Sequence, residues 1–276
     1  MAKKKKLFCE ISPTTYAISL QKGICQRHVQ DMFSKEKFAS EVRGDKLPNV
    51  VSTHSSNIIK RAPGVDPVSQ ENKATNIEIG GNKINGTIIH PGEVFSFWRA
   101  VGKTTAKNGF KEGRVLVSNK LQPGVGGGLC NLGNTIHMLI LHSPLEVTEI
   151  HYHSDALAPD PNGIRVPFSA GTSVSYNYID FRFRNNTDQD VQLIVWRDGE
   201  ISCAELRSEK EFPWTYRIVE EDHHFEKQGE KYYRIGKIYK ETLDRETGEL
   251  IKRELIRDNH SEVMFDYDLI PKEQIR

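Results

Sequence analysis

Long apolar runs are missing from this chain of 276 residues. No stretch reaches the roughly eighteen consecutive apolar residues that a membrane-spanning helix requires. The opening MAKKKKLFCE has the basic start of an export signal, but the following ISPTTYAISLQKG lacks the unbroken apolar segment that export requires. We therefore expect no transmembrane segment and a cytoplasmic location.

Cysteine is scarce, and the net charge is close to zero. Cys9, Cys25, Cys130 and Cys203 lie far apart and form no C-x-x-C motif, so in a chain without an export signal we expect free thiols. The net charge of +1 gives no reason to expect a nucleic-acid partner. The charge is nevertheless uneven, because residues 1–66 hold 12 Lys and Arg against 6 Asp and Glu.

Motifs for common cofactors and metals are also absent. The glycine run at 124–128 is not followed by the Gly-Lys-Ser/Thr ending of a phosphate loop, and its spacing differs from the dinucleotide fingerprint. His137 and His142 are five residues apart, which places them on different faces of a helix, and no H-x-x-x-H or H-E-x-x-H pattern occurs. The sequence therefore predicts no cofactor and no metal site.

The pattern of apolar residues and turns predicts an α+β fold built mainly from antiparallel sheet. Residues 1–66 are expected to form a basic N-terminal arm that ends at the turn-rich RAPGVDP. Residues 67–204 are expected to form an α+β core, in which 67–86 is an amphipathic helix and YIDFRFRNNTDQDVQLIVWRDGEISCAELRS forms three strands. Residues 205–276, with KYYRIGKIYKETL and ELIKREL, are expected to form a β-rich extension.

One helix is expected at the centre of the core. In PGVGGGLCNLGNTIHMLILHSP, residues 123–144, a glycine run directly precedes Cys130, and apolar residues then recur at helical spacing until Pro144 ends the helix. Cys130 therefore stands at a junction between a strand and a helix.

The first functional hypothesis is a cysteine-dependent acyl-transfer or amide-hydrolysing enzyme. The positive end of the helix would stabilise a thiolate at Cys130. Histidines two apart in HYHSD lie on one face of a strand, and either would serve as the base. An acidic residue would orient the imidazole. The candidate catalytic residues are Cys130, His151, His153, Asp155 and Asp180.

The second hypothesis is a binding protein without catalysis. Glycine amides and the start of a helix accept an anionic group such as a carboxylate or phosphate, and Cys130 then only packs beneath the loop. The candidate ligand-binding residues are Gly126, Gly127, Gly128 and Asn134; Asn134 is also an alternative orienting group in the enzyme hypothesis.

Three stretches carry a family resemblance. INGTIIHPGEVFSFW, GRVLVSNKLQPGVGGGLC, and EIHYHSD followed by IDFRFRNNTD resemble, in order and spacing, the VanW family, named after an accessory protein encoded with B-type vancomycin-resistance operons. The resemblance implies a context of glycopeptide resistance or the cell envelope, with a peptide or peptidoglycan-precursor ligand, and no established reaction.

This chain departs from the family pattern near the predicted centre. Asn131 stands where the family has Gln, Gly133 where it has Ser, and Gly171 where it has an acidic residue. Because these departures surround Cys130, we favour the binding hypothesis for this chain and keep the enzyme as the alternative.

Overall fold

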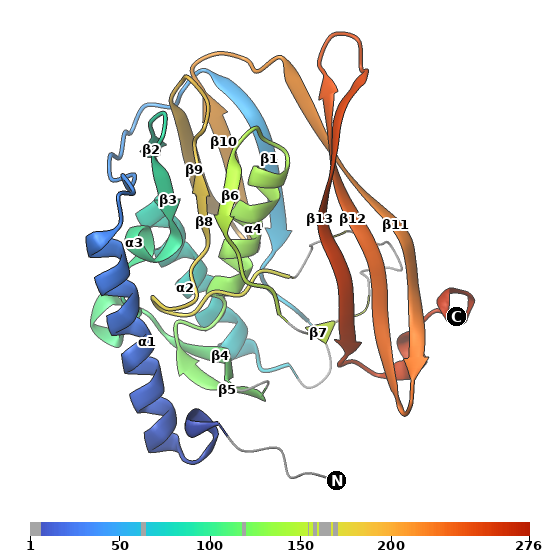
Figure 1. The fold of residues 1–276 in the computed structure, drawn as a ribbon. Coiled ribbons are helices and arrows are strands. Elements are labelled where there is room, and N and C mark those ends of the chain that lie inside the picture. The colour runs from blue at the N-terminus through green and yellow to red at the C-terminus, as the bar shows by residue number, and fades with distance from the viewer. Residues whose placement is uncertain are drawn as a thin grey trace.

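The chain folds into layers of helix and antiparallel sheet, which Figure 1 shows for the computed structural model. The structure describes residues 7–61, 65–117, 120–153, 155–156, 159, 167 and 171–276. The α-helices are α1 (Pro13–Phe33), α2 (Pro67–Ile84), α3 (Phe97–Val101) and α4 (Leu129–Leu141), and short 3-10 helices are η1 (Phe8–Glu10), η2 (Ala106–Asn108), η4 (Tyr267–Leu269) and η5 (Lys272–Gln274). The strands are β1 (Asn49–Asn57), β2 (Thr87–Ile89), β3 (Val94–Ser96), β4 (Glu112–Val117), β5 (Lys120–Val125), β6 (Glu146–Glu149), β7 (Asp155–Ala156), β8 (Arg182–Arg184), β9 (Val191–Asp198), β10 (Ile201–Ser208), β11 (Trp214–Gln228), β12 (Lys231–Asp244) and β13 (Leu250–Val263). The predicted α+β class, with mainly antiparallel sheet, is confirmed.

The first sheet has the order β1-β10-β9-β2, and every pair in it is antiparallel. An Asp-Gly turn, which is typical of hairpins, joins β9 to β10, with Gly199 at φ +56°. Alternate residues of β10 are buried, so Ala204 and Leu206 face the main core. A smaller sheet, β3-β8-β6, adds the stacked rings of Phe95 and Phe183 to the same core.

The predicted C-terminal β extension is present as three long strands. β11, β12 and β13 pair antiparallel, and the short β7 joins β13 in parallel. The three long strands form the orange-red layer beside the core in Figure 1. Ile238 of β12 packs against Met138 and Leu141 of α4, so the extension covers one side of the central helix.

Helix α4 is buried almost throughout, as the predicted central position requires. Leu132 and Ile136 face the main core, and α2 crosses the same side. Gly80 of α2 permits this crossing because a Cβ there would lie 2.9 Å from a methyl group of Leu132. Glycine disfavours a helix interior, yet Gly80 and Gly81 both serve as contact points here, and Gly81 lies against Val195 of β9.

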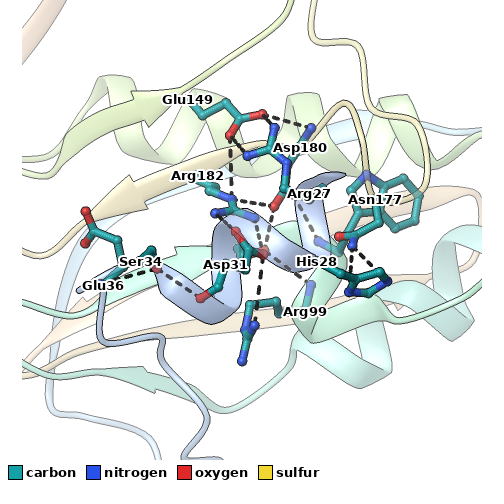
Figure 2. A network of polar contacts seen from close by, with 12 residues as sticks. Arg27, His28, Asp31, Ser34, Glu36, Arg99, Glu149, Asn177, Asp180 and Arg182 are labelled. Atoms are coloured by element: carbon teal, nitrogen blue, oxygen red, sulfur yellow. Dashed lines mark hydrogen bonds and ion pairs between the residues drawn. The ribbon is translucent and has the colours of Figure 1, made fainter. Parts of the chain in front are cut away.

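A buried ionic network fixes α1 to the core (Figure 2). Arg182 of β8 donates two hydrogen bonds of 2.8 Å to Asp31 of α1 and one of 2.7 Å to Asp180. Arg27 of α1 donates to both carboxylate oxygens of Glu149 at 2.6 and 2.7 Å. The helix is therefore attached through charged side chains.

The predicted domain boundaries at residues 66 and 204 stay a prediction. Strands β1 and β10 both cross these predicted boundaries, one by its pairing and the other by its length. β1, from the predicted arm, pairs along its length with β10, and β10 itself runs from 201 to 208. The predicted arm and extension therefore share backbone hydrogen bonds with the predicted core.

Candidate functional site

The glycine loop connects the β4–β5 hairpin to the start of α4. Gly126 and Gly128 have φ of +88° and +102°, a region that other residues rarely adopt. Gly127 is restricted by space, because a Cβ there would lie 2.6 Å from backbone atoms of Gly113 and Arg114 in β4. Glycine is therefore required at 126 and 128 by the backbone conformation and at 127 by the close approach of β4.

Asn76 of α2 holds the loop in place. Its side-chain amide donates to the carbonyl of Gly127 at 2.9 Å and to that of Lys111 at 3.0 Å, and its oxygen accepts from the Lys111 amide at 2.7 Å. Asn76 is fully buried. A buried amide with three backbone partners fixes a loop strongly, because losing one partner leaves a desolvated polar group.

The start of α4 faces a lysine. Gly128 is the N-cap residue, and it offers no side-chain acceptor to the first-turn amides. The aliphatic part of Lys73, from α2, passes directly against Gly128. Burial and the nearby Lys60 lower the pKa of Lys73 to about 8. The Lys73 ammonium donates to the side-chain oxygen of Gln70 at 3.4 Å, and among the described residues neither Lys73 nor Lys60 forms an ion pair with a carboxylate, so their positive charges are not neutralised.

The Cys130 side chain is partly buried, and its thiol contacts a backbone carbonyl. Cys130 packs against the main core, and its Sγ donates to the carbonyl of Val174 at 3.6 Å. Burial raises the pKa of the thiol above its ordinary value, and this effect outweighs the stabilisation of a thiolate expected at a helix start. At neutral pH the thiol is therefore protonated.

Asn134 and His137 hold the segment that follows residue 170. Asn134 Oδ1 accepts from the amides of Gly171 and Thr172 at 3.2 and 3.3 Å and from the Thr172 hydroxyl at 3.2 Å. His137 Nδ1 contacts the same hydroxyl at 3.3 Å. Asn134 is buried at this position, so its side-chain oxygen serves the fold.

His137 gives a testable pH dependence of stability. Burial, together with the positive charges of Lys240 and Arg257, lowers its pKa from 6.5 to about 3. Between these pH values the unfolded chain binds a proton that the folded chain does not, so stability falls as pH falls, by up to about 1.4 kcal/mol per pH unit from this group. Denaturant unfolding at pH 7, 6, 5 and 4 measures the slope. His137→Asn should reduce it; an unchanged slope would contradict this origin.

The two candidate histidines lie beyond the end of β6, next to the 171–175 segment. Ser173 donates its amide to the carbonyl of His151 at 2.8 Å, and His153 donates to that of Gly171 at 2.9 Å. The exposed His151 ring contacts Glu149 Oε1 through Nε2 at 3.0 Å. The backbone of segment 171–174 is therefore hydrogen-bonded both to the backbone of the histidine stretch and to the thiol of Cys130.

The two candidate acids have separate positions. Asp180 is fully buried and accepts hydrogen bonds from Ser96 Oγ at 2.6 Å, from the amides of Trp98 and Phe181, and from Arg182. Burial raises the pKa of Asp180, while these donors act in the opposite direction. The backbone of Asp155 pairs with Glu262 in β13, and its side chain lies outside the described residues.

Sequence reasoning missed three residues of this region. Glu149 is the acid that contacts His151. It precedes that histidine by two residues, and residues two apart on a strand lie on the same face, so the sequence pattern could have identified it. Lys73 and Asn76 come from a helix some fifty residues before the loop, and no local pattern connects them to it. Within the described part of the chain, no group of three or more His, Cys, Asp or Glu side chains is arranged to hold a metal ion.

The fold and the loop together define a mixed α+β protein with a glycine-started helix at its centre. Comparison with known proteins matches residues 72–206 to the family described as "VanW like protein". The chain is 27% identical over 228 residues to the vancomycin B-type resistance protein VanW of Enterococcus faecalis (strain ATCC 700802 / V583), covering 83% of this chain and 82% of that protein. It is 28% identical over 131 residues to the uncharacterized protein YoaR of Bacillus subtilis (strain 168), covering 48% of this chain and 41% of that protein.

The resemblance to the VanW family that the motifs predict is therefore confirmed, with the family match lying over residues 72–206. No solved structure matches it. In the described residues, no helix is both long and apolar enough to cross a bilayer.

Proposed function

We propose that this protein binds the anionic group of a peptide ligand where the glycine loop meets the start of α4, without catalysis. One observation carries the proposal: the stem of the half-buried Lys73, whose ammonium contacts the neutral side chain of Gln70 and no carboxylate among the described residues, passes along an uncapped helix N-terminus. A carboxylate or phosphate at this position would receive both the helix dipole and the lysine charge.

The low pKa of Lys73 supports an anionic ligand. An ammonium group that is partly buried and lies near Lys60 is destabilised in the free protein. A bound anion would stabilise the charged form of Lys73, which burial and Lys60 disfavour in the free protein. This gain would contribute to the binding free energy. Asn76 and the three glycines would keep the loop amides in a fixed arrangement, which lowers the entropy lost on binding.

Peptidoglycan-precursor peptides are the ligand class that we favour. A relative is named a vancomycin B-type resistance protein, and such precursors carry a C-terminal carboxylate. We also propose that the protein acts in the cytoplasm, where its four free cysteines would stay reduced.

Calorimetric titration with a peptidoglycan-precursor pentapeptide tests the proposal. The free-acid peptide should bind, and its C-terminal amide should bind at least about tenfold more weakly, because a charged hydrogen bond contributes about 1.5–3 kcal/mol. Lys73→Met should reduce this difference to the smaller part that the helix dipole contributes. Inorganic phosphate should compete with the free-acid peptide.

The matched control is Lys107→Met, because Lys107 is exposed on η2. It should leave the affinity unchanged, as should Cys130→Ala. Equal affinity of the acid and the amide for the natural sequence would refute an anion site, and a loss of affinity on Cys130→Ala alone would argue against a purely packed cysteine.

The affinity should also depend on pH with a defined sign. A bound anion raises the pKa of Lys73 above its value of about 8 in the free protein. Binding should therefore be strongest below pH 8 and should weaken above it by up to about tenfold per pH unit. The Lys73→Met variant should show a flat profile between pH 7.5 and 9.5, and a flat profile for the natural sequence would exclude Lys73 as the charge that binds.

Cysteine-dependent acyl transfer is the second candidate function. The observation in its favour is that Cys130 and the stretch 151–153 contact the same short segment, 171–174. Because burial raises the pKa of the Cys130 thiol, the reaction would need a rearrangement that exposes the sulfur, and we rank it below binding.

A further inference from the structure

Helix α1 has two faces that differ in exposure. Leu20, Ile24 and Arg27 lie on the inner face and are half-buried, and Arg27 is held there by its pair with Glu149. No residue of the helix is fully buried. Figure 1 shows α1 along the outside of the molecule, so the face opposite Arg27 points away from the core.

The exposed face carries the spacing of a coiled coil. Its residues follow one another at steps of four, three, four and three; they are Ile18, Lys22, Cys25, Val29 and Met32, and all five are exposed. The mean step of 3.5 residues is the spacing by which two α-helices stay in contact along one line. An ordinary surface helix turns its apolar stripe toward the core, whereas α1 turns this one outward. We call these five residues the α1 seam.

The charges along this face favour a second copy of the same helix as the partner. The five positions that flank the seam hold no Lys, Arg, Asp or Glu; they are Ser19, Gln21, Gln26, His28 and Phe33. Two copies of α1 therefore bring no like charges together along their flanks, and the flanks offer no cluster of charge to a strongly charged partner. A twofold pair also needs only one patch that is complementary to itself.

We propose that two copies of this protein pair through their α1 seams, as antiparallel helices about a twofold axis. In a parallel pair equivalent positions face each other, so Lys22 would meet Lys22 of the second copy, and these like charges repel. In an antiparallel pair Lys22 lies opposite Cys25 of the second copy, and Ile18 lies opposite Val29. The lysine stem then covers the thiol while its ammonium reaches solvent. The single charge in the seam therefore selects the antiparallel arrangement.

The size of the seam sets the expected strength of the dimer. Ile18, Met32 and Phe33 are 54%, 70% and 78% exposed, so each has much apolar surface left to cover. The seams and flanks of two copies would bury on the order of 1,000 Å² in total, which is the lower limit of a specific interface. The dimer should therefore be weak, with a dissociation constant in the micromolar range.

Sedimentation equilibrium of the full chain tests the proposal. Between about 1 and 200 µM the protein should pass from monomer to dimer, with a reducing agent present so that disulfides do not contribute. The triple variant Ile18→Gln, Val29→Gln and Met32→Gln should raise the dissociation constant at least about tenfold, because it removes the apolar contacts at the centre of the interface. Its thermal midpoint at 1 µM should equal that of the natural sequence, because these side chains are exposed in the monomer.

The matched control removes exposed apolar residues elsewhere. The triple variant Leu250→Gln, Ile251→Gln and Leu255→Gln changes three side chains of β13 that are 54%, 55% and 52% exposed. It should form the dimer as the natural sequence does. A loss of the dimer in this control as well would show that association does not depend on the α1 seam, and would contradict the proposal.

Two variants of one residue test the orientation. Cys25→Glu should give a dimer at least about tenfold tighter than Cys25→Lys. The reason is that an antiparallel pair places residue 25 opposite Lys22 of the second copy, with opposite charges in the first variant and like charges in the second. In a parallel pair residue 25 faces itself, so both variants would carry like charges. Equal weakening by the two variants would therefore overturn the antiparallel arrangement.

Two further results would overturn the proposal. One is a natural sequence that stays monomeric up to 200 µM, or a dimer that the α1 triple variant does not weaken. The other is a monomer that sediments with vesicles of phosphatidylglycerol and phosphatidylcholine and loses this binding in the α1 triple variant, which would make a lipid bilayer the occupant of the seam.

Discussion

Arg182→Met should lower the free energy of unfolding by about 3–5 kcal/mol, because it removes the cation from a buried ionic network. Arg182 is 7% exposed, and it lies between Asp180, which is fully buried, and Asp31 of α1. Methionine fills much of the space of the arginine stem and provides no donor. The change therefore leaves two carboxylates in a poorly solvated position without their main partner (Figure 2).

The expected loss has two parts. Burial already raises the pKa of Asp180, and loss of the Arg182 cation, which lowers it, should raise it further, so that the carboxyl takes up a proton and part of the penalty is relieved. Asp31 lies on α1, so the loss of its two hydrogen bonds of 2.8 Å should also loosen the helix from the core. Hydrogen exchange in α1 should then be faster than in β8, which stays within its sheet.

Chemical denaturation of Arg182→Met and of Arg184→Met makes the comparison. Arg184 lies two residues further along β8 and pairs with the half-exposed Glu36, so its replacement should cost about 0–1 kcal/mol. The double variant Arg182→Met and Asp31→Asn should be less destabilised than the sum of the single variants, because the asparagine is neutral. Similar effects of the two arginine variants would show that the buried network contributes no more than a surface ion pair.

Cys130 should react with iodoacetamide at least about 100-fold more slowly than Cys25 in the folded protein at pH 7.5, and at the same rate in denaturant. Burial raises the pKa of the Cys130 thiol and restricts access to it, whereas Cys25 is exposed on α1. Peptide mapping by mass spectrometry follows each cysteine separately.

The same measurement decides between packing and catalysis at Cys130. Rapid alkylation of Cys130 well below the ordinary thiol pKa of about 8.5 would contradict the partly buried, protonated thiol described above. If that reactivity were lost in His151→Ala or His153→Ala, the second candidate function would replace the first. Glu149→Gln then becomes the informative partner variant, since Glu149 contacts His151.

Much of the fold was predictable because it depends on local patterns. The helix after Pro67, the Asp-Gly hairpin, the helix that begins beside Cys130 and the three C-terminal strands all follow from spacing and turn residues. The arrangement of strands was not predictable in the same way. β2 and β3 flank one short turn and yet lie in different sheets, because pairing depends on partners far along the chain, such as Leu193 and Phe183.

The candidate site was predictable only where its residues are neighbours in sequence. The glycine run and the helix start form one continuous stretch, and the structure places them together. Lys73 and Asn76 reach the loop because α2 crosses α4 at Gly80. No local sequence pattern predicts where two helices cross. The burial of the Cys130 thiol likewise depends on Val174, which lies 44 positions later.

The pairing of β1 with β10 has a consequence for folding during synthesis. Asn49 pairs with Ser208 and Asn57 with Ile201, so the sheet closes only after residue 208 has left the ribosome. Until then β1 is a strand without a neighbour, and a fragment that ends near residue 200 would expose its unpaired backbone groups to other chains. The long loop that this pairing closes should also make folding slow for a chain of this size. Chaperone dependence should therefore be greater for truncated forms that lack β10 than for forms that lack only the strands after it.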